Sequence, residues 1–221
     1  MRVYLLLFFV VLFSLSACDS SDDTSEMEDM EEVMGQGSEV ARTAIPDPIF
    51  EAYLIGLDVD DEIDGFVNTQ NLLLVDQIVV DDLGINDLSG IQDCPNLYNL
   101  WLQNNSVSVL DVSKNSKLKF LYADGNNLND INVSNLPLLE KLSLRSNALN
   151  QLDVSANTLL QLLEISSNTI SEISLVTNEV LFRLDITENP LTCIEVNEDQ
   201  LNNQDLEWML DSDDSLALDC N

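Results

Sequence analysis

The sequence predicts an α/β, β-rich solenoid with one curved parallel sheet on its concave face, a short helical N-terminal cap and a disulfide-closed C-terminal cap. Three observations predict it. From Leu97 onward the chain resembles itself every 21 residues. Apolar residues recur at fixed columns of this repeat, and an asparagine fills one further column. A period of about 20 to 50 residues indicates stacked units, each of which buries the faces of its neighbours.

The residue type in each column of the repeat follows from the position of that column in the stacked coil. In the stretch L-x-L the side chains alternate, so the leucines point into the solenoid and their neighbours point out from the sheet. The asparagine amide donates and accepts at once, and can satisfy backbone groups where the chain turns away from the strand. The resulting pattern, L-x-x-L-x-L-x-x-N-x-L, is that of leucine-rich repeats. The columns are Leu100, Leu121, Leu142, Leu163 and Leu184; Leu102, Ala123, Leu144, Ile165 and Ile186; Asn105, Asn126, Asn147, Asn168 and Asn189; and Val107, Leu128, Leu149, Ile170 and Leu191.

A degenerate rung precedes the five regular copies. It runs from Val75 through Ile78 to Ile85, with Leu83 where the asparagine should be. We therefore expect about six rungs over residues 75–198. A second apolar pair in each rung also alternates, which predicts an extended rather than helical descending side.

Both ends of such a stack need caps, because an open end exposes leucine columns to water. We expect an N-terminal cap over residues 44–74 and a C-terminal cap over 199–221. Within the first, Ile45–Leu57 has apolar residues at helical spacing, with Asp47 as the N-cap and Pro48 in the first turn.

The N-terminal segment 1–17 predicts a secretory signal peptide. Arg2 precedes a uniformly apolar run, Val3–Phe13, and small residues follow. The run is shorter than the roughly 20 residues needed to cross a bilayer, which disfavours the alternative of an uncleaved anchor. "LSAC" at Leu15–Cys18 is similar to the lipobox of bacterial lipoproteins, and this resemblance implies that Cys18 carries the lipid. Residues 18–43 are acidic and lack aromatic residues and apolar periodicity, so we expect a disordered tether.

The remaining cysteines are expected to be structural. Cys193 and Cys220 should pair in an oxidising compartment. Cys94 should be a small buried thiol rather than a nucleophile, because the chain has no histidine to activate it.

Charge excludes one class of partner. The chain has 40 acidic and 8 basic residues and a net charge of -32. Nucleic-acid binding depends on Lys and Arg releasing counterions from phosphates, so no nucleic-acid partner is expected.

Two groups of residues on the expected concave face are candidates for ligand binding. Trp101, Phe120 and Tyr122 come from adjacent rungs and should form one exposed aromatic patch. Cross-strand packing that only stiffens the sheet is the alternative. The second group consists of basic residues that should line the same face and orient an anionic partner: Lys141, Arg145 and Arg183. Their alternative role is to neutralise Asp124, Glu164 and Asp185.

Two further hypotheses were considered for acidic residues. Glu164 and Asp185 should be neighbours across a strand pair, as in a retaining glycosidase, but an open site flanked by arginines disfavours catalysis. The stretch "DDEIDGFVNTQN" places Asp60, Glu62 and Asp64 like the first ligands of a calcium loop, yet it ends in Asn71 instead of glutamate. A polar turn is the alternative there. We expect no enzyme activity and no cofactor, with calcium as a weak candidate.

From Ile45 to Asn221 the sequence resembles surface leucine-rich repeat lipoproteins of Bacteroidota, and more distantly internalin-like repeats. "IPDPIFEAYLIGL" looks like that family's N-terminal cap, and "LTCIEV" with "LEWML" and "DC" like its disulfide-closed C-terminal cap. "CDSSDD" resembles the export signal to the outer face of the outer membrane; the periplasmic face is the alternative. We expect a lipid-anchored protein that binds a protein or glycan through its concave face, with Glu164 among the binding residues; the repeat motif itself says little about the ligand. A structural envelope protein without such a ligand is the alternative.

Overall fold

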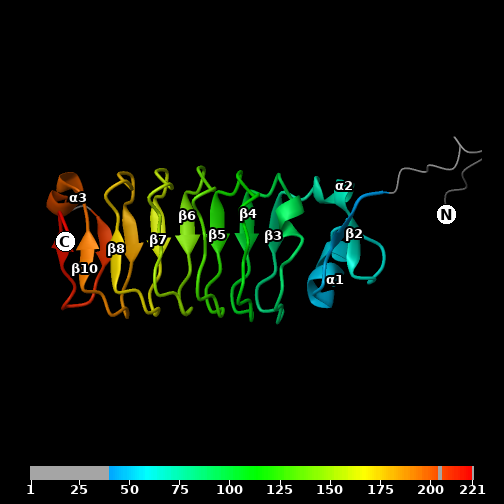
Figure 1. Ribbon diagram of the computed structural model, residues 1–221, viewed down its shortest axis with the longest axis horizontal. Helices are drawn as coiled ribbons and strands as arrows, with labels where there is room; N and C mark the ends of the chain where they lie inside the picture. Colours follow the sequence, from blue (N-terminus) through cyan, green and yellow to red (C-terminus); the bar gives the residue numbers. More distant parts are fainter. Residues whose placement is uncertain (1–39, 204–205, 221) are drawn as a thin grey trace, which may run out of the picture. The chain divides into compact units, whose positions relative to one another are not determined.

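The computed structural model describes residues 40–203 and 206–220, which lie within one compact unit, Val40–Asn221. The expected signal peptide, Cys18 and almost all of the expected tether lie outside the described residues. Short strands and turns of this unit stack side by side in chain order (Figure 1). Within the described ranges no helix is long and apolar enough to cross a membrane.

A seven-stranded parallel sheet, here called the main sheet, forms one wall of the stack and confirms the predicted fold class. Its pairing joins residues 21 positions apart: Asn99 pairs with Phe120, and Phe120 pairs with Lys141. Side-chain alternation with this register puts one leucine column inside every regular rung. In spatial order the strands are β11 (Glu207–Met209), β9 (Arg183–Asp185), β7 (Leu162–Glu164), β6 (Lys141–Ser143), β5 (Phe120–Tyr122), β4 (Asn99–Trp101) and β3 (Gln77–Val79).

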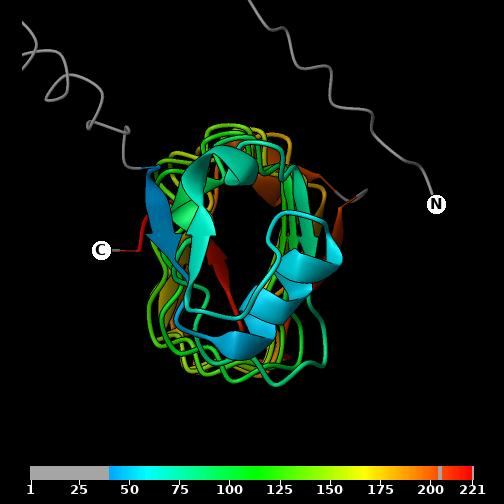
Figure 2. The same ribbon diagram turned by 90° about the vertical axis from the view of Figure 1, so that its right-hand side faces the viewer.

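A second, three-stranded parallel sheet forms part of the opposite wall at the C-terminal end. It comprises β8 (Glu172–Ser174), β10 (Cys193–Glu195) and β12 (Leu216–Ala217). The view along the stack shows the two walls facing each other (Figure 2). The descending side is therefore extended, as the alternating second apolar pair predicts.

Apolar columns between the walls form one continuous core. The column Leu100, Leu121, Leu142, Leu163 and Leu184 is fully buried, and the core cluster runs from Ile45 to Val196. Burial of this size stabilises a fold by about 25 cal/mol per Å² of apolar surface. Because the core and both caps lie within residues 40–221, this segment is an independent folding unit.

The predicted asparagine column forms a ladder between rungs. The Nδ2 atom of Asn126 donates to the carbonyl of Leu102 in the preceding rung (2.9 Å) and to that of Ala123 (3.1 Å). Its Oδ1 atom accepts the backbone N–H of Val107 at 3.0 Å. Asn105, Asn147, Asn168 and Asn189 repeat this pattern of donation.

A second amide ladder, absent from the sequence expectations, lies where the descending side turns back to the main sheet. Asn157 donates to the carbonyls of Val133 and Leu136, and Asn178 to those of Val154 and Asn157. Asn115 and Gln200 make equivalent bonds. In the other two rungs the corresponding position is occupied by Leu136 and Cys94, which have no side-chain amide.

The N-terminal cap contains a two-stranded antiparallel sheet and two helices. These elements are β1 (Arg42–Ala44), α1 (Pro48–Gly56), β2 (Phe66–Asn68) and α2 (Thr69–Leu72). Asp47 caps α1 as predicted, because its Oδ1 accepts the N–H groups of Ile49 (2.9 Å) and Phe50 (3.2 Å). The Tyr53 hydroxyl accepts the N–H of Val79 at 2.9 Å, so α1 also covers the free edge of β3. A 3₁₀ turn, η1 (Ile91–Asp93), follows β3.

The C-terminal cap continues the solenoid as well as covering it. The helix α3 (Glu198–Asn202) begins with a capping box between Asn197 and Gln200. β11 and β12 then add one strand to each sheet. The predicted disulfide between Cys193 and Cys220 is present. Cys94 is buried and unpaired, and burial raises the pKa of its thiol to about 12, as expected of an inert cysteine.

Candidate ligand-binding surface

The outer face of the main sheet is the surface that the sequence predicts to be concave. Three columns of side chains point outward from it, because the strands pair in register. They are Asn99, Phe120, Lys141, Leu162 and Arg183; Trp101, Tyr122, Ser143, Glu164 and Asp185; and Gln103, Asp124, Arg145, Ser166 and Thr187. All seven predicted ligand-binding residues therefore lie on one face, in two groups.

The first group is the aromatic patch, which consists of Trp101, Phe120 and Tyr122. The Trp101 and Tyr122 rings meet edge to face, with centroids 5.5 Å apart and an interplanar angle of 78°. Trp101 is nevertheless 39% exposed. The patch thus combines the cross-strand packing considered as its alternative with open aromatic surface.

Two neighbours extend the aromatic patch. Val79 pairs with Trp101 across β3 and β4 and is 41% exposed. The exposed position of Val79 could be predicted from the sequence. Ile78 is the inward-facing residue of the degenerate rung, so its neighbours along the strand point outward. On the other side, the Lys141 ammonium lies 5.5 Å from the centre of the Phe120 ring, a cation–π contact. Within the described residues Lys141 has no carboxylate partner at ion-pair distance.

The second group forms a charged network of arginines and carboxylates. Arg145 bridges Glu164 at 2.8 Å and Asp185 at 3.1 Å, measured from its Nη2. Arg183 Nε lies 3.6 Å from the same Glu164 oxygen. Glu164 and Asp185 are each only 8% exposed. The two arginines therefore neutralise buried carboxylates, which is the alternative considered for them, while Lys141 belongs to the aromatic patch.

Hydrogen bonds to side chains and backbone hold this network in place. The Ser143 hydroxyl donates to Asp124 at 2.6 Å and can reach Glu164 at 3.2 Å. Asp124 also accepts the backbone N–H of Arg145 (2.8 Å) and the amide of Gln103 (2.7 Å). Strand alternation places Gln103 and Asp124 on the outer face, but it does not predict the hydrogen bonds that join them into this polar row. It joins the aromatic patch to the charged network.

Electrostatics keep the Tyr122 phenol protonated. Burial raises its pKa, and the charges of Glu164 and Asp124 raise it further. Its hydroxyl is therefore available as a donor at neutral pH.

Glu164 and Asp185 are not arranged for glycoside hydrolysis. Arg145 contacts both Glu164 and Asp185, and Ser166 and Thr187 donate to Asp185. Carboxylates engaged in this way are poorly suited to act as acid or nucleophile.

Contacts with other residues of the protein hold the segment 60–71, which was the candidate for a calcium loop. Glu51 Oε1 accepts the backbone N–H groups of Asp64 (3.0 Å), Gly65 (2.7 Å) and Phe66 (3.1 Å). The Asp64 carboxylate pairs with Arg42. No set of three acidic or cysteine side chains within the described ranges could hold a metal ion. Asp60, Glu62 and Asp64 are thus not gathered into a site, and the loop has the geometry of the polar turn.

Comparison with solved structures identifies the fold. The functional domain of InlJ from Listeria monocytogenes matches with a TM-score of 0.62 and 26% identity, over 71% of this chain and 38% of that one. The chain has the leucine-rich repeat fold. A leucine-rich repeat protein of Leptospira interrogans matches with a TM-score of 0.50 and 24% identity, over 57% of this chain and 34% of that one. The LRIM1/APL1C complex matches with a TM-score of 0.51 and 24% identity, over 55% and 25%.

This leucine-rich repeat protein therefore spans well under half the length of the solved chains just named. No protein-family model and no curated protein matches it. These similarities establish the repeat fold, and a fold alone does not fix a function.

Proposed function

We propose that this protein is a lipid-anchored, extracytoplasmic binding protein that recognises a protein partner through the outer face of its main sheet. The exposed aromatic patch is the observation that supports this proposal most. Rigid aromatic side chains offer large contact area at small entropic cost and dominate many protein interfaces. The charged network beside it is rigid and internally neutral, so it suits a role in orientation rather than as the anchor.

The ring geometry favours a protein over a glycan. Trp101 and Tyr122 stand edge to face, so the two rings do not form a common flat platform for sugar stacking. Together with Val79 and Phe120, these rings form an apolar, uneven surface next to the Lys141 ammonium. Such a surface suits an apolar side chain of a protein partner next to an acidic group.

Site-specific cross-linking tests the binding surface. A photoreactive phenylalanine analogue at Phe120 should give a discrete adduct with a partner in intact cells, and Trp101→Ala should weaken that adduct about 30-fold, as expected for a hot-spot residue. Phe66→Ala, which removes an exposed aromatic of the N-terminal cap outside the patch, is the matched control and should leave the adduct unchanged. An adduct of equal strength from Val109, or none from Phe120, would favour the structural alternative without a ligand on this face.

The proposed location is the outer membrane, facing the extracellular side. The lipobox-like "LSAC" and the acidic run after it support this, and the Cys193–Cys220 disulfide fits an oxidising compartment. The mass of the mature N-terminal peptide should correspond to an acylated Cys18. Protease added to intact cells should remove the folded unit. Protection from protease would instead favour the periplasmic face.

A further inference from the structure

Exposed apolar side chains gather along one edge of the solenoid. Among residues 40–203 and 206–220, 19 large apolar side chains are exposed, and six of them lie one or three residues before a strand of the main sheet. The strands are parallel, so these positions share one edge, which α2 and α3 also mark (Figure 1). We call this row the apolar edge: Leu74, Tyr98, Leu138, Leu159, Val180 and Phe182.

The apolar edge follows the repeat and is separate from the aromatic patch. Leu138, Leu159 and Val180 occupy the same column, 21 residues apart, and are 39%, 45% and 49% exposed. Adjacent rungs lie about 4.8 Å apart, so these side chains form a straight row one residue wide. Buried leucines already fill the core columns, so this column has no role in packing between rungs.

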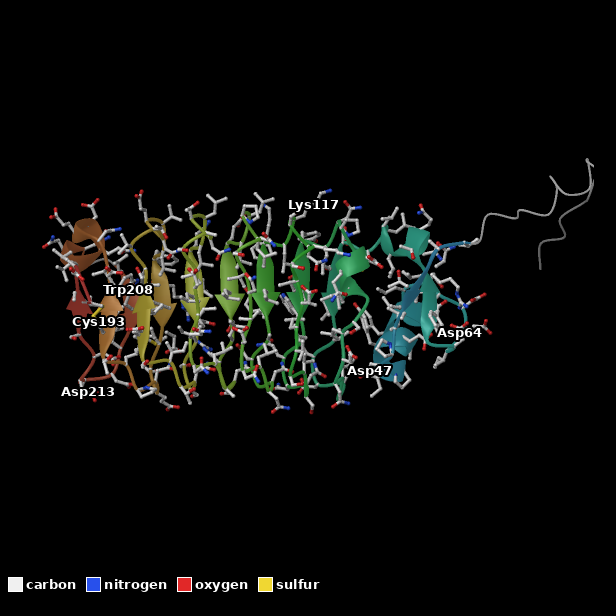
Figure 3. All side chains as sticks on the ribbon, viewed as in Figure 1. Asp47, Asp64, Lys117, Cys193, Trp208 and Asp213 are labelled. Atoms are coloured by element: carbon white, nitrogen blue, oxygen red, sulfur yellow. A yellow bond between two sulfur atoms is a disulfide. The ribbon has the colours of Figure 1, made fainter. Side chains whose placement is uncertain are left out.

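The charge of this edge differs from that of the whole protein. The turns of the regular rungs at this edge, 92–98, 113–119, 134–140, 155–161 and 176–182, contain three lysines, two glutamates and one aspartate. Lys119 pairs with Glu140 at 2.8 Å, whereas Lys114 and Lys117 are exposed. Lys117, which Figure 3 labels, lies 21 residues before Leu138 in the same column and therefore falls within the row, between Tyr98 and Leu138. A protein of net charge -32 therefore presents one edge whose regular turns carry no net charge. Glu198 and Asp199 on α3 end the row.

The chain enters the described unit at the same edge. The Ala41 carbonyl accepts the N–H of Thr69, the first residue of α2, at 2.9 Å. Val40 is the first described residue, so 21 residues separate it from Cys18. A lipid on Cys18 would thus connect to the folded unit beside Leu74 rather than at the opposite edge.

We propose that the apolar edge rests on a lipid surface, with its leucines in the headgroup region and Lys114 and Lys117 against lipid phosphates. A straight, narrow row with little charge fits a flat and deformable interface, whereas a protein partner must supply a matching groove. Self-association through this edge would bring two highly acidic bodies together. Contact along this edge would leave the main sheet upright on the membrane, with its outer face open to a partner.

Vesicle flotation of residues 40–221 tests the proposal without the apolar leader. The wild type should float with vesicles of phosphatidylethanolamine and phosphatidylglycerol. Combining Leu138→Asp, Leu159→Asp and Val180→Asp should reduce binding at least about tenfold. The matched control combines Ile63→Asp, Val109→Asp and Leu218→Asp, which add the same charge at exposed apolar sites elsewhere, and should bind like the wild type. Lys114→Gln with Lys117→Gln should remove any preference over phosphatidylcholine vesicles.

A second measurement does not depend on charged variants. Leu159→Trp should show a blue-shifted emission with vesicles and quenching by brominated lipids, whereas Val109→Trp should show neither. Absence of vesicle binding by the wild type, or equal binding by both triple variants, would overturn the proposal. Concentration-dependent dimers that the edge variant alone abolishes would assign the edge to a second copy instead. Trp101→Ala should leave vesicle binding unchanged, so failure here is distinguishable from failure of the proposed partner site.

Discussion

At the scale of single residues, the buried amides of the first ladder hold neighbouring rungs together. Asn126 is 7% exposed, yet it accepts a buried N–H that would otherwise lack a partner and donates to two carbonyls that it shares with Asn105 and Asn147. An unsatisfied buried polar group costs about 1 to 3 kcal/mol. One side chain therefore accounts for a contact between rungs that leucine packing alone cannot supply.

We predict that Asn126→Ala lowers the free energy of unfolding by about 1 to 3 kcal/mol, because it leaves the Val107 N–H buried without its partner, while the Leu102 carbonyl keeps only its bond from Asn105. Urea unfolding followed by circular dichroism would measure the change. Asn127→Ala, at the exposed adjacent position, is the control and should change stability by less than about 0.5 kcal/mol. Equal effects of the two substitutions would refute a structural role for the ladder.

The two ladders differ in how far the sequence reveals them. The first recurs in all five copies at a spacing of 21 residues, so its column is visible and its role follows from amide chemistry. The second is interrupted by Leu136 and Cys94, and Gln200, within α3, is displaced by one residue from the 21-residue spacing. Outward columns were likewise predictable from alternation, but the ion pairs of Arg145 depend on side-chain reach. Periodicity predicts the face of the sheet from which a side chain points, but not the residue with which that side chain forms an ion pair.

At the scale of elements, α1 is joined to the first rung by its own cap residue. Asp47 Oδ1 caps the helix, while Oδ2 accepts the backbone N–H of Asn86 at 2.8 Å. Burial alone would raise the pKa of Asp47, but hydrogen bonds from four backbone N–H groups outweigh it and lower the pKa. The carboxylate is thus stabilised in its ionised form by folding.

We predict that Asp47→Ala destabilises the protein by about 2 kcal/mol at neutral pH, because both the cap and the link to Asn86 are lost. A lowered folded-state pKa contributes stability that is complete above the unfolded-state value of about 3.9 and is lost as the pH falls through the folded value. The difference from the wild type should therefore shrink in acid. Urea titrations at several pH values would show it, with Asp130→Ala as an exposed control. A difference that is independent of pH would contradict this account.

Strand pairing was predictable on one wall and not on the other. The L-x-L stretch recurs in every regular rung, so the register of the main sheet follows from the period. The descending side has an equally regular apolar pair, but among the described rungs only Glu172–Ser174 and Cys193–Glu195 pair there, with Leu216–Ala217 added by the cap. Hydrogen bonding on that wall depends on how closely the turns bring neighbouring backbones together, which side-chain alternation does not encode.

At the scale of the whole molecule, each rung contacts mainly the rungs on either side. Stability of such a stack is approximately a sum of rung terms and nearest-neighbour interface terms. The repeat length is the quantity that lets the apolar columns and the amide ladders remain continuous. Removing one complete period should therefore shorten the stack and preserve its interior, whereas any other length should break both.

We predict that deleting residues 128–148, which is one period of 21, gives a folded protein with a cooperative transition and an m-value about a tenth smaller. Leu149 then takes the place of Leu128, and Asn168 follows at the spacing that Asn147 had. Deleting residues 128–147 instead shifts every later side chain by one position, which moves the leucine columns from the core to the surface. That variant should lack a cooperative transition and bind hydrophobic dyes. If both deletions folded equally well, rungs of unequal length would be interchangeable, and packing between equal coils would not be what holds this protein together.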